Sequence, residues 1–262
     1  NQWITGFYVG DAQFNITILY NNSSNGYYDI FLASLHNGNW TSIRSYGNES
    51  AEEGRALCMD SSGNIYLLAE FFSDSILIEG NWFHNSSNSG EMLLMKYHAD
   101  GSFAWVKQFG GDGWDQVYTM KLSSDNHMWI GGDFDSNNFI LGNDTLHEAT
   151  GFGDADAFVA RLDTNGNVDW ARSFYSGYNE SLWKLSPLPD GKMAAAFVSD
   201  GDVISIPPFS PTDIYATNFL AAFDSNGTTL WAKAIECIGT NDIATDSTGI
   251  FTPVSFPMIQ FQ

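Results

Sequence analysis

The sequence predicts an all-β fold, a β-propeller-like array of about four repeat units, and three observations predict it. The first is a tryptophan that recurs at nearly constant spacing. The second is a set of short apolar runs joined by glycine turns, and the third is the lack of a helical period of useful length. The recurring tryptophans are 65, 65 and 61 residues apart: Trp40, Trp105, Trp170 and Trp231. Each unit of about 60 to 65 residues is expected to form an antiparallel blade of four to five strands.

A β-hairpin is expected around each recurring tryptophan. An apolar run comes first, a turn that contains glycine follows, and the tryptophan lies on the returning strand. Glycine suits such turns because it adopts positive φ without a steric penalty. The four apolar runs are residues 30–35, 92–97, 157–162 and 219–223. These tryptophans are expected to occupy equivalent buried positions, with Trp3, Trp129 and Trp183 also in the core.

A second hairpin is expected between these. Residues 56–66 match residues 118–129, and weaker copies lie at 185–193 and 243–251. The extra length of each unit falls in one insertion loop, such as residues 80–87. A β-propeller is the favoured arrangement of such repeats, and a β-solenoid is the alternative.

The repeat is similar to the bacterial and archaeal β-propeller repeat (SBBP-type) family. The similarity rests on residues 128–134 (MWIGGDF), 139–142 (FILG) and 154–163 (DADAFVARLD), followed by Gly166 and Trp170. Residues 60–66 (DSSGNIY) fit the first half of the family's unit, and the last unit, with Pro253 and Pro257, fits least. The resemblance implies a secreted or surface-attached scaffold without an assigned reaction.

The expected organisation is a single repeat domain over residues 1–262. Its units are approximately 1–27 (partial), 28–89, 90–154, 155–217 and 218–262. Residues 3–7 parallel residues 129–133, so the sequence starts inside a unit, and residues 251–255 occupy the same place at the other end. Residues 258–262 alternate apolar and polar side chains as a half-buried strand does. They are expected to pair with residues 2–7, either within one molecule as a ring or with the next molecule as a longer or filamentous assembly, which is favoured.

The charge and hydropathy of the chain limit the classes of partner that it is expected to bind. The chain has 31 acidic and 10 basic residues, for a net charge of −21, and 15% of its residues are aromatic. Nucleic acid and anionic membrane surfaces would be repelled by that charge. No apolar stretch approaches the roughly 20 residues that span a bilayer, so membrane insertion is not expected. Self-association, or contact with other surface proteins or glycans, is expected instead.

Sequons predict an extracellular or cell-surface glycoprotein. Chance alone gives about 3 to 4 Asn-x-Ser/Thr motifs in this composition. The chain has nine: Asn15, Asn21, Asn22, Asn39, Asn48, Asn85, Asn143, Asn179 and Asn226. The alternative is that turns rich in Asn, Ser and Thr produce such motifs without being modified.

Signatures of catalysis are missing from the sequence. It has no nucleophile elbow and no P-loop, and its five histidines lack the spacing of zinc ligands. A non-catalytic structural or adhesive protein is therefore expected. The alternative is a carbohydrate-binding module whose platform is Trp82 with Phe83, while Trp114 is either core or exposed. A propeller hydrolase is disfavoured, because it would need converging Asp, Glu and Arg and the chain has only four arginines.

Calcium is the one metal that the sequence offers a place for. Asp133, Asp135 and Asn137 supply oxygen ligands at alternate positions, as calcium loops do, but the glycine at position six is missing and Asp144 replaces the glutamate at position twelve. The alternative is that such aspartates cap turns between strands. Cys58 and Cys237 are expected to be buried separately and not to form a disulfide.

Overall fold

The computed structural model describes residues 2–23, 26–85, 89–149, 153–201, 204–209, 217–235, 243–245 and 250–251. Within these ranges the chain forms β-strands joined by turns and no helix, which confirms the predicted all-β class. The chain divides into two compact units, residues 1–117 and 118–262, and each is described by itself. The described part contains no helix that could span a lipid bilayer.

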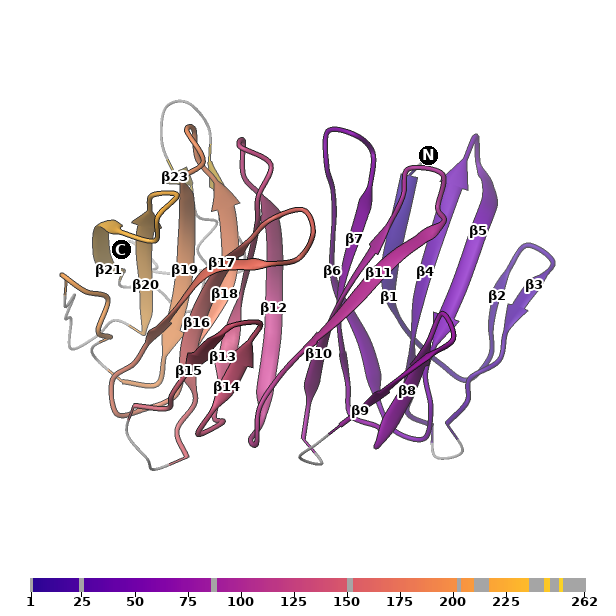
Figure 1. Ribbon diagram of the computed structural model, residues 1–262, viewed down its shortest axis with the longest axis horizontal. Coiled ribbons are helices and arrows are strands. Elements are labelled where there is room, and N and C mark those ends of the chain that lie inside the picture. Colours follow the sequence, from indigo (N-terminus) through magenta and orange to yellow (C-terminus); the bar gives the residue numbers. More distant parts are fainter. Residues whose placement is uncertain are drawn as a thin grey trace, which may run out of the picture. The chain divides into compact units, whose positions relative to one another are not determined.

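The first unit contains two antiparallel sheets, drawn in indigo to purple in Figure 1. The three strands of the first sheet, in spatial order, are β1 (Gln2–Val9), β4 (Tyr28–His36) and β5 (Asn39–Tyr46). The four strands of the second sheet, in spatial order, are β6 (Glu52–Met59), β7 (Ile65–Phe71), β10 (Glu91–Tyr97) and β11 (Phe103–Phe109).

The second unit repeats the four-stranded arrangement twice (Figure 1). The third sheet consists of β12 (Asp115–Leu122), β13 (Met128–Phe134), β16 (Asp156–Leu162) and β17 (Val168–Phe174). The fourth sheet consists of β18 (Glu180–Pro187), β19 (Met193–Ser199), β20 (Asn218–Phe223) and β21 (Thr229–Ile235). The short strands β22 (Ala244–Thr245) and β23 (Ile250–Phe251) pair where the last copy of the second hairpin is expected.

Strand positions are numbered along the four-stranded sheets in chain order, so β1, β4 and β5 of the first sheet stand at the second, third and fourth positions. In the first three sheets a small hairpin is inserted before the strand at the third position. The inserted strands are β2 (Ala12–Phe14) with β3 (Thr17–Leu19), β8 (Ser75–Ile78) with β9 (Asn81–His84), and β14 (Phe139–Leu141) with β15 (Asp144–Leu146). The described part of the predicted insertion loop at residues 80–87 supplies the turn and the second strand, β9, of one of these hairpins, and residues 86 and 87 lie outside the described residues. Both predicted hairpin types are present, but the predicted units 28–89, 90–154 and 155–217 each contribute strands to two consecutive sheets. Unit 28–89, for example, supplies β4 and β5 to one sheet and β6 and β7 to the next.

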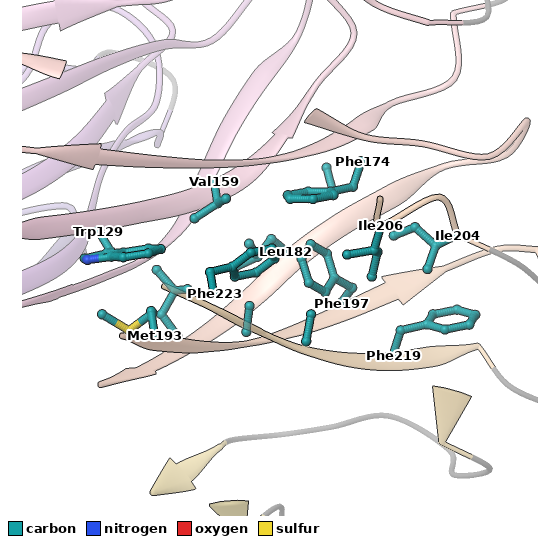
Figure 2. Packing of buried hydrophobic residues seen from close by; sticks show 14 of the residues in the cluster. Trp129, Val159, Phe174, Leu182, Met193, Phe197, Ile204, Ile206, Phe219 and Phe223 are labelled. Carbon is teal, nitrogen blue, oxygen red and sulfur yellow. The ribbon is translucent and has the colours of Figure 1, made fainter. Parts of the chain in front are cut away.

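Apolar side chains fill the space between the two sheets of each unit. In the second unit Figure 2 shows Trp129 and Val159 from the third sheet facing Leu182, Phe197 and Phe223 from the fourth. In the first unit, buried Ile30 and Leu32 of β4 pack with the inner faces of β7 and β10. Face-to-face packing of consecutive sheets therefore forms both cores.

A β-bulge recurs near the end of the third strand in every sheet and places the recurring tryptophan. Trp105, Trp170 and Trp231 pair with the residue just before the bulge, whereas Trp40 pairs with Leu35 just after it. In the first hairpin the turn is short, and His36 pairs with Asn39. The turns of the other three hairpins are longer, so their tryptophans lie two strand positions further from the turn than Trp40 does. The prediction of four equivalent positions is therefore wrong for Trp40.

Burial also differs from the prediction. Trp170 is 9% exposed and Trp129 is fully buried, while Trp3, Trp40, Trp105 and Trp231 are only half-buried. Trp183 is 44% exposed and stacks on Tyr118 with ring centroids 5.3 Å apart. The assignment of Trp183 to the core is wrong because its strand, β18, turns that side chain away from the packed face.

Candidate functional site

Buried acids recur where the strands of each sheet begin. The third strand has Asp29 in β4, Glu91 in β10 and Asp156 in β16, and these residues pair with Tyr8, Phe71 and Phe134 of the second strand. The first strand of the following sheet opens with Glu52, Asp115 or Glu180. All six side chains are buried. In the fourth sheet the neutral Asn218 occupies the equivalent place, paired with Val198.

Two first-strand acids close the loop that leads into their strand. Glu52 accepts the backbone N–H of Asn48 at 3.0 Å, the N–H of Ser73 at 3.2 Å and the hydroxyl of Ser73. Glu180 accepts the backbone N–H of Ser176 at 2.7 Å, its hydroxyl, and the Ser199 hydroxyl at 2.7 Å. Both glutamates thus bind the amide four residues earlier and a serine near the end of the second strand.

The third-strand aspartates bind an amide seven residues earlier. Asp29 Oδ2 accepts the N–H of Asn22 at 2.9 Å and the Tyr8 hydroxyl at 3.4 Å. Asp156 Oδ2 accepts the N–H of Ala149 at 2.9 Å. In both residues the second oxygen, Oδ1, is buried and has no hydrogen-bond partner. A buried acceptor without a donor is costly, especially when it carries charge.

Electrostatics couples these acids in two pairs, Asp29 with Glu52 and Asp156 with Glu180, called here the junction pairs. Burial raises the pKa of Glu52 to about 7, although the hydrogen bonds from Ser73 and Asn48 lower it. The negative charge of Asp29 adds to the rise. Burial likewise raises the pKa of Asp156 to about 7, with a further contribution from Glu180. The pKa values of Asp29 and Glu180 are also raised, mainly by burial.

Glycine leaves room for the third-strand acid. A Cβ atom at Gly47 would overlap the Asp29 carboxyl group, and one at Gly110 would overlap that of Glu91. Gly47 directly follows β5, and Gly110 directly follows β11. The backbone therefore passes close to the buried carboxyl at a place that a larger residue would fill.

Glu70 is a buried acid that, unlike the members of the junction pairs, forms an ion pair with an arginine. Its carboxylate binds Arg55 Nη2 at 2.7 Å and Nε at 2.8 Å, and it also accepts the N–H of Val117. Burial raises its pKa to about 7, and the Arg55 charge opposes that rise. The junction pairs have no such counter-charge, because no ion pair reaches any of their four carboxylates in the described structure.

A second polar cluster lies in the second unit around Arg161. Its Nη2 binds Asp125 at 2.6 Å and its Nη1 binds Asp169, while His127 has one ring nitrogen 3.6 Å from each aspartate. Burial raises the pKa of Asp125, but the Ser123 hydroxyl and Arg161 outweigh it and the net shift is downward. The cluster ties β16 and β17 to the turn after β12. Sequence reasoning missed this cluster, because its members are brought together by the pairing of β16 with β17 and by the turn after β12.

The sequons divide into two groups. Asn15, Asn22, Asn39, Asn143, Asn179 and Asn226 are exposed, and Asn21, Asn48 and Asn85 are half-buried. The amide of Asn21 donates to Tyr8 and Tyr27, that of Asn48 donates to Ser75, and that of Asn85 donates to Ser89. Asn179 uses both ends of its amide, toward Ala155 and Asp200. Attachment of a glycan is therefore least hindered at the exposed turns that hold Asn15, Asn143 and Asn226, whereas the amide of the exposed Asn39 donates to the Asn37 carbonyl at 3.3 Å.

The two residues of the predicted aromatic platform point in different directions. Trp82 is 57% exposed and pairs across its hairpin with the exposed Leu77. Phe83 is half-buried and packs against the core of the first unit. Trp114 is exposed and contacts Phe72, with ring centroids 5.2 Å apart.

The predicted calcium ligands have different surroundings. Asp133 is buried and accepts the hydroxyls of Tyr118, at 3.0 Å, and Ser181, while Asp135 is half-buried and Asn137 is exposed. Among the described residues no three His, Cys, Asp or Glu side chains are grouped so that they could hold a metal ion. Asp60, which is not one of the candidate calcium ligands, caps the turn after β6: its carboxylate accepts the N–H groups of Ser62 and Asn64.

Two sequence predictions fall wholly or partly outside the described residues. Cys58 lies half-buried in β6, and Cys237 is not among the described residues. The strand expected at residues 258–262 is also outside them. Comparison with known proteins gives no match, because no protein-family model fits the sequence and no curated protein is significantly similar to it.

Proposed function

We propose that this chain is a non-catalytic, extracellular structural protein of the β-propeller repeat class that assembles by strand addition at β1. The observation that carries the proposal is the edge of β1 that no described strand covers. In the other three sheets the second strand lies between a first and a third strand. Among the described strands, β1 pairs only with β4.

The side chains of β1 are more exposed to solvent than those of the equivalent strands in the second and third sheets. Ile4, Phe7 and Val9 of β1 are 42%, 48% and 57% exposed, whereas every residue of the equivalent strands β7 and β13 is buried. Seven of the sixteen exposed large apolar side chains in the described chain belong to residues 4–27. Open strand edges and clustered apolar surface are typical of sites where another strand pairs.

The proposed occupant is the segment 258–262 of a neighbouring copy. It follows Pro257, which favours an extended entry, and its alternation of apolar and polar residues suits a strand with one buried face. Head-to-tail pairing of this kind does not close on itself and extends into a filament. The repeated sheets, their face-to-face packing and the resemblance to a surface-protein repeat family support the propeller class.

Deleting residues 258–262 tests the assembly. We expect the wild-type protein to sediment as a mixture of oligomers that grows with concentration, and the truncated protein to sediment as a monomer. The matched control is Trp82→Ser, which removes an exposed apolar side chain away from β1 and should leave the assembly unchanged. An assembly that keeps its size after the deletion contradicts the proposal, and so does a wild-type protein that is monomeric at all concentrations.

Carbohydrate binding is the second candidate function, and the exposure of Trp82 is the observation that favours it. A single exposed indole beside Leu77 offers one stacking surface, because Phe83 faces the core.

Hydrolysis has less support. The cluster that most resembles an acid–base site has its arginine bound to Asp125 and Asp169, which leaves that cation engaged in two ion pairs.

A further inference from the structure

We propose that the two junction pairs are pH-sensitive latches. Each pair carries one proton near neutral pH, and the loss of that proton at higher pH loosens the loop that its glutamate closes, residues 48–52 in the first unit and 176–180 in the second. This inference is independent of the proposed assembly at β1.

The geometry of the latch is repeated in two separate units. In the first unit Asp29 and Glu52 bind the amides of Asn22 and Asn48, and in the second unit Asp156 and Glu180 bind those of Ala149 and Ser176. The sequence offsets are seven residues for both aspartates and four for both glutamates. Each glutamate therefore closes the loop before the first strand of the next sheet, and each aspartate binds an amide upstream of its own strand.

Among the described residues, no group around the pairs supplies a positive charge. Tyr8, which itself bonds to Ser45, and Ser73 face the first pair, and burial raises the pKa of Tyr8 to about 12, so this phenol stays neutral. Ser176 and Ser199 face the second pair, and Glu148 and Asp154 add negative charge to it. Two ionised carboxylates in such a place repel each other and also lose solvation. One proton per pair removes one of the two charges.

The proton has a place to reside. The glutamates accept three hydrogen bonds each, which suits an ionised carboxylate. The aspartates each leave a buried Oδ1 without a partner, which is the less favourable place for negative charge. Asn218 fills the equivalent position in the fourth sheet, so a neutral side chain of this shape fits there.

The direction of the pH effect follows from the raised pKa values. On folding the pKa of Asp156 rises from 3.8 to about 7 and that of Glu52 rises from 4.5 to about 7. Because the two carboxyl groups of a pair interact, each value describes the proton of the pair, whichever carboxyl group holds it. The folded state thus binds more protons than the unfolded state between these limits. The stabilisation is complete below the unfolded pKa and is lost as pH rises through about 7. The unfolding equilibrium constant should rise by up to about tenfold per pH unit for each proton.

The test compares the wild type with Asp29→Asn and Asp156→Asn at about pH 6 and about pH 8.5. Hydrogen-exchange protection of the Asn48 and Ser176 amides, corrected for intrinsic exchange, is the readout. Protection at Ser176 should fall about tenfold or more at the higher pH in the wild type and stay nearly constant in Asp156→Asn. Asp29→Asn should do the same for Asn48 only. The control Asp190→Asn changes an exposed carboxylate and should behave as the wild type.

Three outcomes would overturn the proposal. The first is wild-type protection that does not change with pH, and the second is an asparagine variant that keeps the wild-type pH dependence. The third is full restoration of protection by excess calcium chloride at the higher pH in the wild type only, which would show that the pairs bind a cation. If a variant does not fold, carboxyl carbon NMR of the wild type decides: titration of all four carboxyls below about pH 5 contradicts the latch.

Discussion

At the scale of single residues, the described fold buries acids in two different ways. Glu70 is buried with Arg55 as its counter-ion, whereas the junction pairs are buried with hydrogen-bond donors and a second acid. The first arrangement depends on a cation and the second depends on a proton. Substitutions at the two kinds of site should therefore have different consequences.

Arg55→Ala should destabilise the first unit by about 3 to 5 kcal/mol, because it leaves the fully buried Glu70 carboxylate without its cation. Urea unfolding near neutral pH measures the loss. The double variant Arg55→Leu with Glu70→Leu should recover most of it, since both charges are removed together. Glu53→Gln is the matched control, because Glu53 binds the same arginine at 2.8 Å but is itself partly exposed. A loss after Glu53→Gln as large as that after Arg55→Ala would show that Glu70 is not the critical partner.

At the scale of strands and hairpins, the tryptophans of the repeat should not be energetically equal. Trp170→Ala should cost about 3 to 5 kcal/mol, as for a large aromatic in a core. Its ring packs edge-on against Trp129 with centroids 5.0 Å apart, and its Nε1 donates to the Ser225 carbonyl at 3.0 Å. Trp40→Ala should cost less, because Trp40 is shifted by two positions and contacts Phe14 of the inserted hairpin.

Thermal or urea unfolding of the tryptophan variants ranks them, with Trp82→Ala as the exposed reference. Equal losses at Trp40 and Trp170 would contradict the register described for the first hairpin. A loss at Trp82 as large as at Trp170 would contradict the assignment of Trp82 to the surface.

Hairpins were predictable because their signals are local. The run at residues 157–162 and the turn at Gly166 lie within a few residues of each other, and Gly166 adopts a φ of 72° as such turns require. The exception, Trp40, arises from a turn shorter than the others, which moves the register without changing the apolar pattern. The exposure of Trp183 was also unpredictable, since it depends on which face of β18 packs against the neighbouring sheet.

The junction pairs were not predicted, because their members are far apart in sequence and belong to different sheets. Asp29 and Glu52 meet only after two sheets have stacked, and a chain with 31 acids offers many such combinations. One signal was available. Asp29, Glu91 and Asp156 are 62 and 65 residues apart, and Glu52, Asp115 and Glu180 are 63 and 65 apart, close to the spacing of the recurring tryptophans. Acids that recur in register with a structural repeat are candidates for a structural role.

At the scale of the whole molecule, the net charge of −21 opposes lateral contact between copies. The proposed filament grows through β1, where hydrogen bonds and apolar contacts act at short range. Side-by-side contact would instead bring acidic surfaces together over longer distances. Repulsion at such distances is screened by salt, since the Debye length falls from about 10 Å at 0.1 M to about 3 Å at 1 M.

Raising the salt concentration should therefore make filaments bundle without changing the contact at β1. Light scattering should rise several-fold between about 0.1 M and about 1 M sodium chloride, and electron microscopy should show parallel filaments in contact. The variant without residues 258–262 is the matched control: it has the same net charge but should not scatter more at high salt. Glycans at Asn15, Asn143 and Asn226 would keep surfaces apart by their bulk, so bundling of glycosylated protein should need more salt. Bundling that is independent of salt would show that charge does not keep the filaments apart.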